Sequence, residues 1–256
     1  MFIAVTREVS RTLSRCELSY LPRTPIDLKL ARGQNHAYRE ALESLGCYVI
    51  ALPELPEQPD AVFVEDTALV LDELAVITRP GAVSRLAETE TMTHVLSMHR
   101  TLAAIEAPGT LDGGDVLHVG HTLYVGRSAR SNQEGIRQLA AIMAPHGYEV
   151  EPVDLQSCLH LKTAVTQVAP GLLLVNPAWV DPRSFTDVDI LEVDPAEPHA
   201  ANAVWLPGGV IFPCSFPRTR ERLSGRQIPV VTVDMSETEK AEGGVTCCSV
   251  IFKSHL

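Results

Sequence analysis

Five polar side chains recur along this sequence at intervals of 42 to 48 residues. Each stands at the head of a short apolar run typical of a strand: Asp66, Asp112, His160, Asn202 and Cys247. A fixed period in this range indicates repeated structural units, stacked or placed around an axis. If the units surround an axis, two carboxylates, an imidazole, an amide and a thiol meet in one hole. Such a combination of groups predicts an active site.

Two arginines follow the carboxylates at nearly equal spacing. Arg85 lies 19 residues after Asp66, and Arg130 lies 18 residues after Asp112. We therefore expect both guanidinium groups to return to the rim of the hole. Arginine binds carboxylates through two parallel hydrogen bonds. The set suits a ligand with a cation at one end and a carboxylate at the other, such as an arginine-like amino acid.

The predicted chemistry is nucleophilic attack on a guanidinium carbon. The Cys247 thiolate attacks the carbon while Asp66 and Asp112 hold the guanidinium nitrogens. His160 protonates the departing amine and then activates the water that hydrolyses the covalent thiouronium. Taken singly, each residue fits a structural role, since a cysteine heading an apolar strand is usually core and Asp66 could cap a helix. The common period favours the shared site.

The segments between these residues repeat one pattern of two hairpin strands, a helix and a third strand. Hairpins are predicted over residues 67–78, 115–126, 161–176 and 203–212. Helices are predicted over residues 84–98, 132–145, 182–187 (weakly) and 217–225, and third strands over 103–107, 148–153, 189–193 and 228–233. The first copy is divided between the termini, with strand 2–6 pairing with 250–252, a helix ending at Gly46 and a strand over 48–52.

This pattern predicts an α/β fold, a closed five-bladed α/β-propeller of ββαβ repeats with pseudo-fivefold symmetry. Radial repetition protects the edges of the sheets, and no linker divides residues 1–256, so a single domain is expected. A doubly wound open sheet is the alternative, but the hairpins outnumber the helical crossovers. Residues 7–24, which include Leu18, are irregular and polar and are interpreted as a mobile loop.

The composition limits the classes of partner that we expect for this protein. The net charge of −11 argues against a nucleic-acid partner and favours a cationic small molecule. No apolar run reaches the roughly 18 residues of a membrane span, and the first eight residues are charged too early for a signal peptide, so we expect a cytoplasmic protein without a membrane partner. The six cysteines lack zinc-site spacing, so free thiols and no metal are expected.

Eight motifs together resemble those of the dimethylarginine dimethylaminohydrolase family, a group of guanidino-modifying pentein propellers. They lie at residues 63–66, 79–85, 110–115, 128–132, 159–163, 201–203, 217–221 and 244–249, in the family's order and spacing. The resemblance implies hydrolysis of asymmetric dimethylarginine or monomethylarginine to citrulline and a methylamine. It implies a covalent cysteine intermediate and no cofactor.

The resemblance also implies a role for each matching residue. Cys247 corresponds to the nucleophile, His160 to the general acid and base, and Asp66 and Asp112, with Glu65 beside them, to the guanidinium ligands. The matching substrate-carboxylate ligands are Arg85 and Arg130, the positions near the substrate amino group are Leu18 and Asp60, and a backbone contact comes from Ala241. Many bacterial relatives have Glu where this chain has Asp112, so the carboxylate reaches less far here.

Two rival functions remain open at this point. Arginine deiminases share the superfamily but are usually longer and typically have Arg-Asp where this chain has Glu65-Asp66. A non-catalytic propeller that acts as a binding protein is the second rival, although it would have no reason to align Cys, His and Asp on one axis. The sequence leaves the oligomeric state open, with a homodimer as one alternative.

Overall fold

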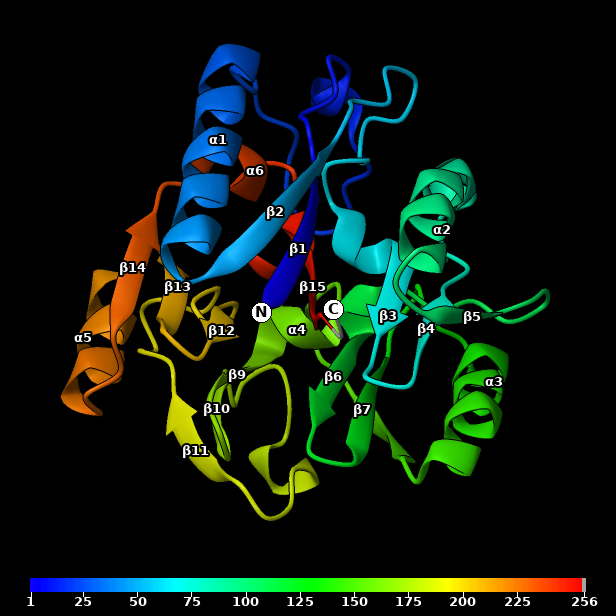
Figure 1. Ribbon diagram of the computed structural model, residues 1–256. Coiled ribbons are helices and arrows are strands. Elements are labelled where there is room, and N and C mark those ends of the chain that lie inside the picture. Colours follow the sequence, from blue (N-terminus) through cyan, green and yellow to red (C-terminus); the bar gives the residue numbers. More distant parts are fainter. Residues whose placement is uncertain (255–256) are drawn as a thin grey trace.

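A computed structural model describes residues 1–254 and contains five sheets of three strands each. The last two residues of the expected domain lie outside this described part. Figure 1 shows the sheets grouped around a central region, with helices α1, α2, α3 and α5 on the outside. In every sheet two strands form an antiparallel pair and the third runs parallel to the middle strand. The predicted order of two hairpin strands and a third strand is thereby confirmed, and in the described chain an α-helix precedes the third strand in four of the five units.

Four of the sheets each come from one continuous stretch of chain. Their strands are β3 (Ala68–Val70), β4 (Leu74–Ile77), β5 (Thr101–Ala104), β6 (Val116–Val119), β7 (Thr122–Arg127), β8 (Glu149–Asp154), β9 (Val165–Ala169), β10 (Leu172–Val175), β11 (Asp189–Glu192), β12 (Val204–Leu206), β13 (Gly209–Pro213) and β14 (Val230–Val233). The hairpins turn where the sequence predicts them, and β5 lies a few residues before the predicted strand over 103–107.

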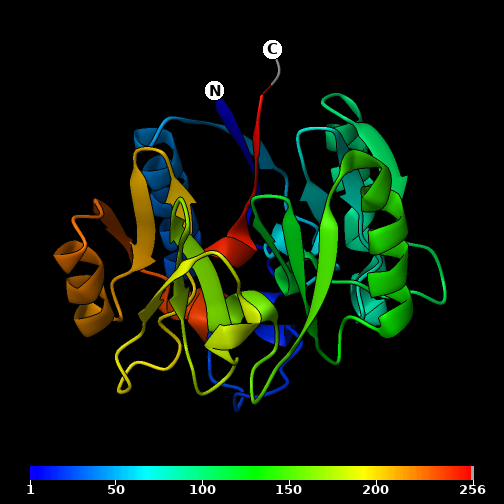
Figure 2. The ribbon, with the colours of Figure 1, turned by 90° about the horizontal axis from the view of Figure 1, so that it is seen from below.

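The fifth sheet joins the two ends of the described chain. Its strands are β15 (Val250–Lys253), β1 (Phe2–Arg7) and β2 (Cys47–Leu52), in that order. Phe2 pairs with Lys253 in the antiparallel half, as the sequence predicts. Figure 2 shows the two ends emerging side by side. The first and last segments therefore complete one structural unit.

Side chains cap the first turn of two helices, and a proline begins a third. Helix α1 (Leu28–Ser44) starts at Asp27, whose carboxylate accepts hydrogen bonds from two backbone N–H groups of the first turn, and Gly46 follows its end at φ +90°. Helix α3 (Gln133–Met143) is capped by the Asn132 side chain. Helix α5 (Pro217–Gly225) has proline in its first turn and matches its predicted range.

Two predicted helices differ in the structure. The first turns of the segment predicted over 84–98 are a 3₁₀ helix, η3 (Val83–Glu88), and α2 (Thr89–Ser97) follows. The weak helix near 182–187 is only a 3₁₀ turn, η6 (Pro182–Ser184). Among the described residues, no helix combines the length and the apolar character that crossing a membrane requires.

Apolar side chains form five clusters, and each cluster contains residues of two consecutive units. Ile3 and Val5 of β1 pack with Ala75 and Ile77 of β4. Similar clusters join the second unit to the third, the third to the fourth and the fourth to the fifth. The remaining cluster joins the fifth unit to the first, where Ile211 of β13 packs with residues such as Tyr38 of α1. The polar residues identified above lie inside this ring of contacts.

Candidate active site

One-turn helices carry four of the five recurring polar residues. Asp66 lies in η2 (Val64–Thr67), Asp112 precedes η4 (Gly113–Asp115), His160 precedes α4 (Leu161–Ala164), and Cys247 lies in η7 (Thr246–Cys248). The prediction that each residue opens a strand is therefore wrong, because the strand begins after the turn. Asn202 alone precedes a strand, β12, without such a turn. The repeat thus places a one-turn helix, rather than a strand end, at the contribution of four of the five units.

Glycines allow two of these turns to touch. A Cβ atom on Gly113 would lie 2.0 Å from the Glu65 carbonyl oxygen, and one on Gly114 would lie 2.7 Å from Asp66 Oδ1. Such distances are too short for any other side chain. The Gly114 N–H instead donates to Asp66 Oδ1 at 3.0 Å. The Gly113-Gly114 pair is therefore required for the close approach of the two carboxylate-bearing turns.

His160 lies between the two predicted guanidinium ligands. Its Nε2 is 2.9 Å from Asp112 Oδ2 and 3.9 Å from Asp66 Oδ1. Burial by itself lowers the pKa of His160, but the charges of Asp66, Asp115 and Asp112 outweigh it and raise the pKa to about 9. At neutral pH the imidazole is therefore protonated. It can act as a general acid.

Asp66 is held ionised by its neighbours. Burial opposes its charge, but His160 and Arg85 outweigh burial and hold the pKa of Asp66 at about 2. Arg85 Nη1 donates to Asp66 Oδ2 at 2.6 Å, and the Arg85 residue is only 4% exposed. The predicted rim position of Arg85 is therefore wrong. Glu88, three residues on, also pairs with Arg85, and that helical spacing was a signal of the buried pair in the sequence.

Glu65 is occupied by a different set of groups. Lys162 Nζ lies 2.6 Å from Glu65 Oε1, and the Thr246 hydroxyl donates to Glu65 Oε2 at 2.7 Å. Asn202 in turn donates to the Lys162 carbonyl and to the Thr246 hydroxyl. Asn202 is thus linked to Glu65, the neighbour of Asp66, through Lys162 and Thr246, two residues that the sequence interpretation missed.

Cys247 is half-buried, and its thiol faces the site. The Gly244 N–H lies 3.3 Å from Cys247 Sγ, so it can donate to a thiolate there. Burial and the charges of Glu65 and Asp66 raise the pKa of Cys247 to about 12, so the resting thiol is protonated. The neighbouring Cys248 is fully buried, and its Sγ donates to the Gly244 carbonyl. The two cysteine side chains diverge from one turn of 3₁₀ helix.

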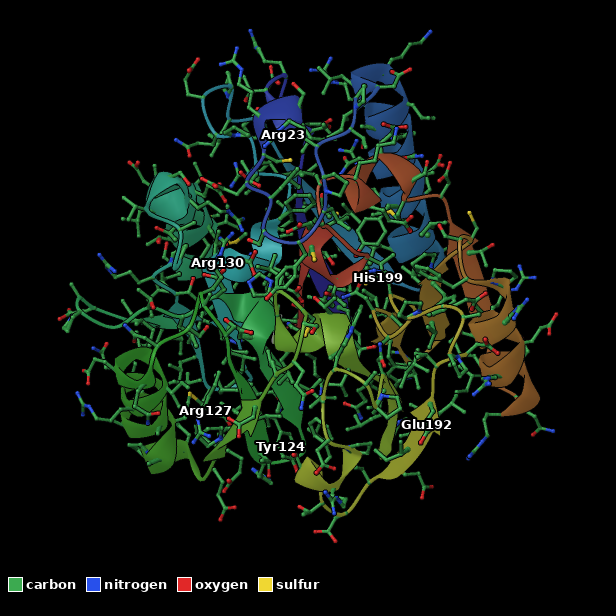
Figure 3. The ribbon with its side chains drawn as sticks, turned by 180° about the vertical axis from the view of Figure 1, so that it is seen from behind. Arg23, Tyr124, Arg127, Arg130, Glu192 and His199 are labelled. Carbon is green, nitrogen blue, oxygen red and sulfur yellow. The ribbon has the colours of Figure 1, made fainter. Side chains whose placement is uncertain are left out.

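A small cavity of about 20 Å³ brings most of the predicted residues together. Its walls include Asp60, Asp66, Arg85, Arg130, His160, Ala241 and Cys247. Arg130 lies at the edge, with its Nη1 3.9 Å from Asp112 Oδ2, and Figure 3 labels it in the view from behind. Asp112 sits behind His160 and does not line the cavity.

Leu18 and Asp60 belong to the entrance region. The half-buried Leu18 packs on the core cluster below it and lines neither cavity. Asp60 accepts hydrogen bonds from the Glu17 N–H, and burial raises its pKa. One carboxylate holds the Leu18 loop in place, because Glu242 accepts hydrogen bonds from three consecutive backbone N–H groups over residues 19–21.

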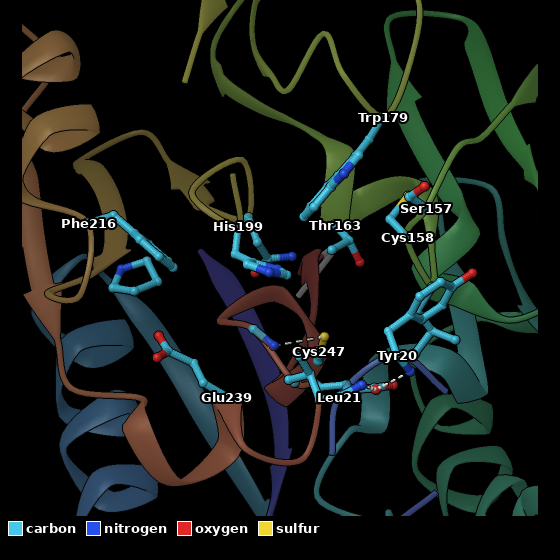
Figure 4. A pocket seen from close by; sticks show the side chains of 16 residues that line it. Tyr20, Leu21, Ser157, Cys158, Thr163, Trp179, His199, Phe216, Glu239 and Cys247 are labelled. Atoms are coloured by element: carbon cyan, nitrogen blue, oxygen red, sulfur yellow. Dashed lines mark hydrogen bonds between the residues drawn. The ribbon is translucent and has the colours of Figure 1, made fainter. Parts of the chain in front are cut away.

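A larger cavity of about 280 Å³ adjoins the small one and was not foreseen from the sequence. Figure 4 shows Cys247 in its wall, with aromatic rings around it. Leu159, Glu242, Gly243 and Cys247 line both cavities. Because its residues come from separate loops, no local pattern in the sequence marks it.

Asp115 is a further missed residue with a structural explanation. It accepts hydrogen bonds from the hydroxyls of Ser128 and Ser131 and from the Leu161 N–H. Burial raises the pKa of Asp115 to about 6 against the opposing effect of His160 and these bonds. Asp115 ties the Arg130 loop to the turn after His160, so it positions both residues.

The only metal-like grouping among residues 1–254 is Asp66, Asp112 and His160, whose ligand atoms lie within 4.8 Å of one another. The protonated His160 and the Arg85 guanidinium already supply positive charge there. A divalent cation would have to displace a proton against that charge. The two carboxylates are therefore already paired with positively charged groups of the protein.

Comparison with known proteins agrees with this geometry. A family model described as arginine deiminase matches residues 34–204. The chain is 40% identical to N(G),N(G)-dimethylarginine dimethylaminohydrolase of Pseudomonas aeruginosa over 88% of its length and 90% of the relative, and 39% identical to the Streptomyces coelicolor protein of that name over 96% and 95%. A solved structure of the Pseudomonas aeruginosa protein, a Cys-to-Ser mutant complexed with citrulline, superposes with a TM-score of 0.94 at 38% identity, covering 98% of this chain and all of that one.

Proposed function

The chain belongs to the dimethylarginine dimethylaminohydrolase family, and from this premise we propose that it hydrolyses Nω-methylated arginines to citrulline and a methylamine. Asymmetric dimethylarginine and monomethylarginine are the proposed substrates. The observation that carries the proposal is the pairing of a protonated His160 with the Cys247 thiol in the wall of one small cavity. A nucleophile and an acid in one site can split an amidine carbon–nitrogen bond.

The proposed binding mode follows the charges of the site. The substrate guanidinium lies against Asp66, while Asp112 holds His160 from behind, and the substrate carboxylate is bound by Arg130 and Arg85. Arg85 lines the cavity while it also holds Asp66, so its contribution is divided between the two tasks. The substrate amino group is proposed to lie near Asp60, the Leu18 loop and the Ala241 backbone, and Glu65 braces the site through Lys162.

The proposed chemistry begins with loss of the thiol proton to solvent. A bound guanidinium brings positive charge beside Cys247, which offsets the carboxylate charges and lowers the pKa of the thiol. The thiolate forms a bond to the guanidinium carbon, His160 gives its proton to the methylated nitrogen, and that carbon–nitrogen bond breaks. The neutral His160 then takes a proton from water as the water oxygen attacks the same carbon. The carbon–sulfur bond breaks and citrulline leaves.

We also propose that the five sheets form one closed ring, a propeller with pseudo-fivefold symmetry that acts as a single domain. The apolar clusters between consecutive units, including the fifth and the first, support this arrangement. The cytoplasm is the proposed location of the enzyme.

The test compares kcat/KM for asymmetric dimethylarginine, monomethylarginine, symmetric dimethylarginine and arginine, with citrulline as the readout. We expect the first two to react at least about tenfold more efficiently than arginine. A pocket that pairs both hydrogens of an unmethylated nitrogen loses about 1–3 kcal/mol when a methyl group replaces one of them. The pocket of this enzyme should instead accept the methyl group. Symmetric dimethylarginine should react poorly because it carries a methyl on the nitrogen that stays. Arginine as the best substrate would replace the proposal with deiminase activity.

A further inference from the structure

The larger cavity beside Cys247 has no task in the reaction as proposed. Its volume is about 280 Å³, and Asp66, Arg85 and His160 do not line it. It meets the small cavity at Leu159, Glu242, Gly243 and Cys247, which line both. A group leaving the carbon bonded to Cys247 therefore has space on the side away from Asp66 and Arg85.

Aromatic rings form much of its wall. The Trp179 and His199 rings meet edge to face with centroids 4.8 Å apart, and Phe216 and Tyr20 add two more rings. Figure 4 shows the Trp179, His199 and Phe216 rings directed toward the same space as Cys247. Ring faces attract alkylammonium ions and also shed water from alkyl groups.

The charge of the wall is negative. Glu239 and Glu242 line the cavity, and no lysine or arginine does. Glu239 accepts hydrogen bonds from the Ser215 hydroxyl, and within residues 1–254 no cationic side chain lies within ion-pair distance of it. The Glu242 carboxylate accepts hydrogen bonds from the neutral N–H groups of the Leu18 loop. The cavity therefore presents negative charge that no protein cation neutralises.

We propose that this cavity is a binding compartment for a small alkylammonium ion, the amine released by the reaction. This inference rests on the proposed function. During hydrolysis the positive charge of the substrate guanidinium ends on the released amine, because citrulline is neutral at its ureido group and the freed amine takes one further proton from water. The amine thus becomes a cation next to Cys247, where an aromatic and anionic compartment opens while the covalent intermediate is still held by Arg130.

The test is first made on the resting protein, without turnover. The chain has two tryptophans, Trp179 in the cavity wall and Trp205 in β12. Titration with dimethylammonium chloride should change the Trp179 fluorescence saturably, and sodium chloride at equal ionic strength should not. The Trp205→Phe variant should keep the signal and Trp179→Phe should lose it. Glu239→Gln should weaken the binding about two- to fivefold, since one partly exposed charge is removed.

The matched control is Glu221→Gln, which removes the same charge from the exposed face of α5 outside the cavity and should leave the affinity unchanged.

In the kinetic arm, dimethylammonium should inhibit methylarginine hydrolysis, and Glu239→Gln should relieve the inhibition. Hydrolysis without any saturable fluorescence change overturns the compartment and leaves the proposed function standing. A saturable change in a protein that hydrolyses no methylarginine keeps the cation site and overturns the proposed function. Equal affinity in Glu239→Gln and the parent overturns the role of that charge and with it the proposal.

Discussion

Two adjacent cysteines meet very different surroundings, although they share one turn of 3₁₀ helix. Cys247 Sγ lies in the wall of both cavities and next to the Gly244 N–H. Cys248 is enclosed in an apolar cluster, and burial raises its pKa well above the usual range. Only the first thiol can meet a ligand, and only there can a bound cation lower the thiol's pKa.

We predict that Cys247→Ser abolishes turnover and that Cys248→Ser keeps most of it. An alkoxide is much harder to form than a thiolate, so the first substitution removes the nucleophile, whereas the second changes a buried packing contact. The measurement is kcat at saturating methylarginine, with circular dichroism to verify folding. Retained activity in Cys247→Ser, with loss in Cys248→Ser, would transfer the nucleophile to the buried cysteine.

The protonated state of His160 has a pH signature. Its pKa of about 9 lies above the usual 6.5, because the surrounding carboxylates stabilise the charged form. We predict that kcat at saturating methylarginine, where the bound guanidinium has lowered the pKa of the Cys247 thiol, falls above about pH 9 as His160 loses its proton. Asp112→Asn should move this descending limb to lower pH by roughly one unit. Imidazole NMR titration of the resting enzyme checks the value directly. A descending limb near 6.5 in the parent enzyme would refute it.

The raised pKa of His160 also makes the stability of the fold depend on pH in a defined direction. A group whose pKa is raised in the folded state stabilises the fold fully below its unfolded pKa, and that contribution fades as pH rises through the folded pKa. For His160 the window lies between about pH 6.5 and 9. Asp66 acts in the opposite direction, since its pKa of about 2 means that its contribution is lost as pH falls from 3.8 toward 2. Both groups favour the fold at neutral and mildly acidic pH.

At the scale of elements, short turns determine the site. The repeat period and the hairpins could be predicted from apolar runs and turn residues, and α5 was predicted at its observed bounds. The one-turn helices could not be predicted, because three or four residues carry too little periodicity to distinguish a helical turn from the end of a strand. Their geometry depends on contacts between units, such as Gly114 donating to Asp66.

The Leu18 loop offers a test of one such long-range contact. Glu242 accepts N–H groups from Ser19, Tyr20 and Leu21, with the last two at 2.6 Å. We predict that Glu242→Gln speeds amide hydrogen exchange at these three residues about 10- to 100-fold, since the amide turns a donor toward groups that are donors themselves. Glu17→Gln, which alters a loop carboxylate bonded to the Ser84 hydroxyl, is the control. Unchanged exchange in Glu242→Gln would show that other contacts hold the loop.

At the scale of the molecule, the convergence of Asp66, His160 and Cys247 on one cavity could be predicted because a repeat places equivalent positions together. The burial of Arg85 was missed, because its spacing from Asp66 placed it at the mouth of the site and its partner Glu88, three residues on, was not taken into account. The larger cavity also escaped prediction, since its rings and carboxylates come from loops of different units. The repeat thus predicts which residues lie together, whereas features that differ between the units depend on contacts that only the three-dimensional structure shows.

The pairing of β1 with β15 has a consequence for synthesis on the ribosome. Strand β1 is translated before the four other sheets, whereas its antiparallel partner follows after them. Until then β1 has an open edge, and the Cys247 thiol, encoded just before that partner, is also absent. The nascent chain can therefore hold four formed sheets and no nucleophile, so the nucleophile and the last strand pairing become available together.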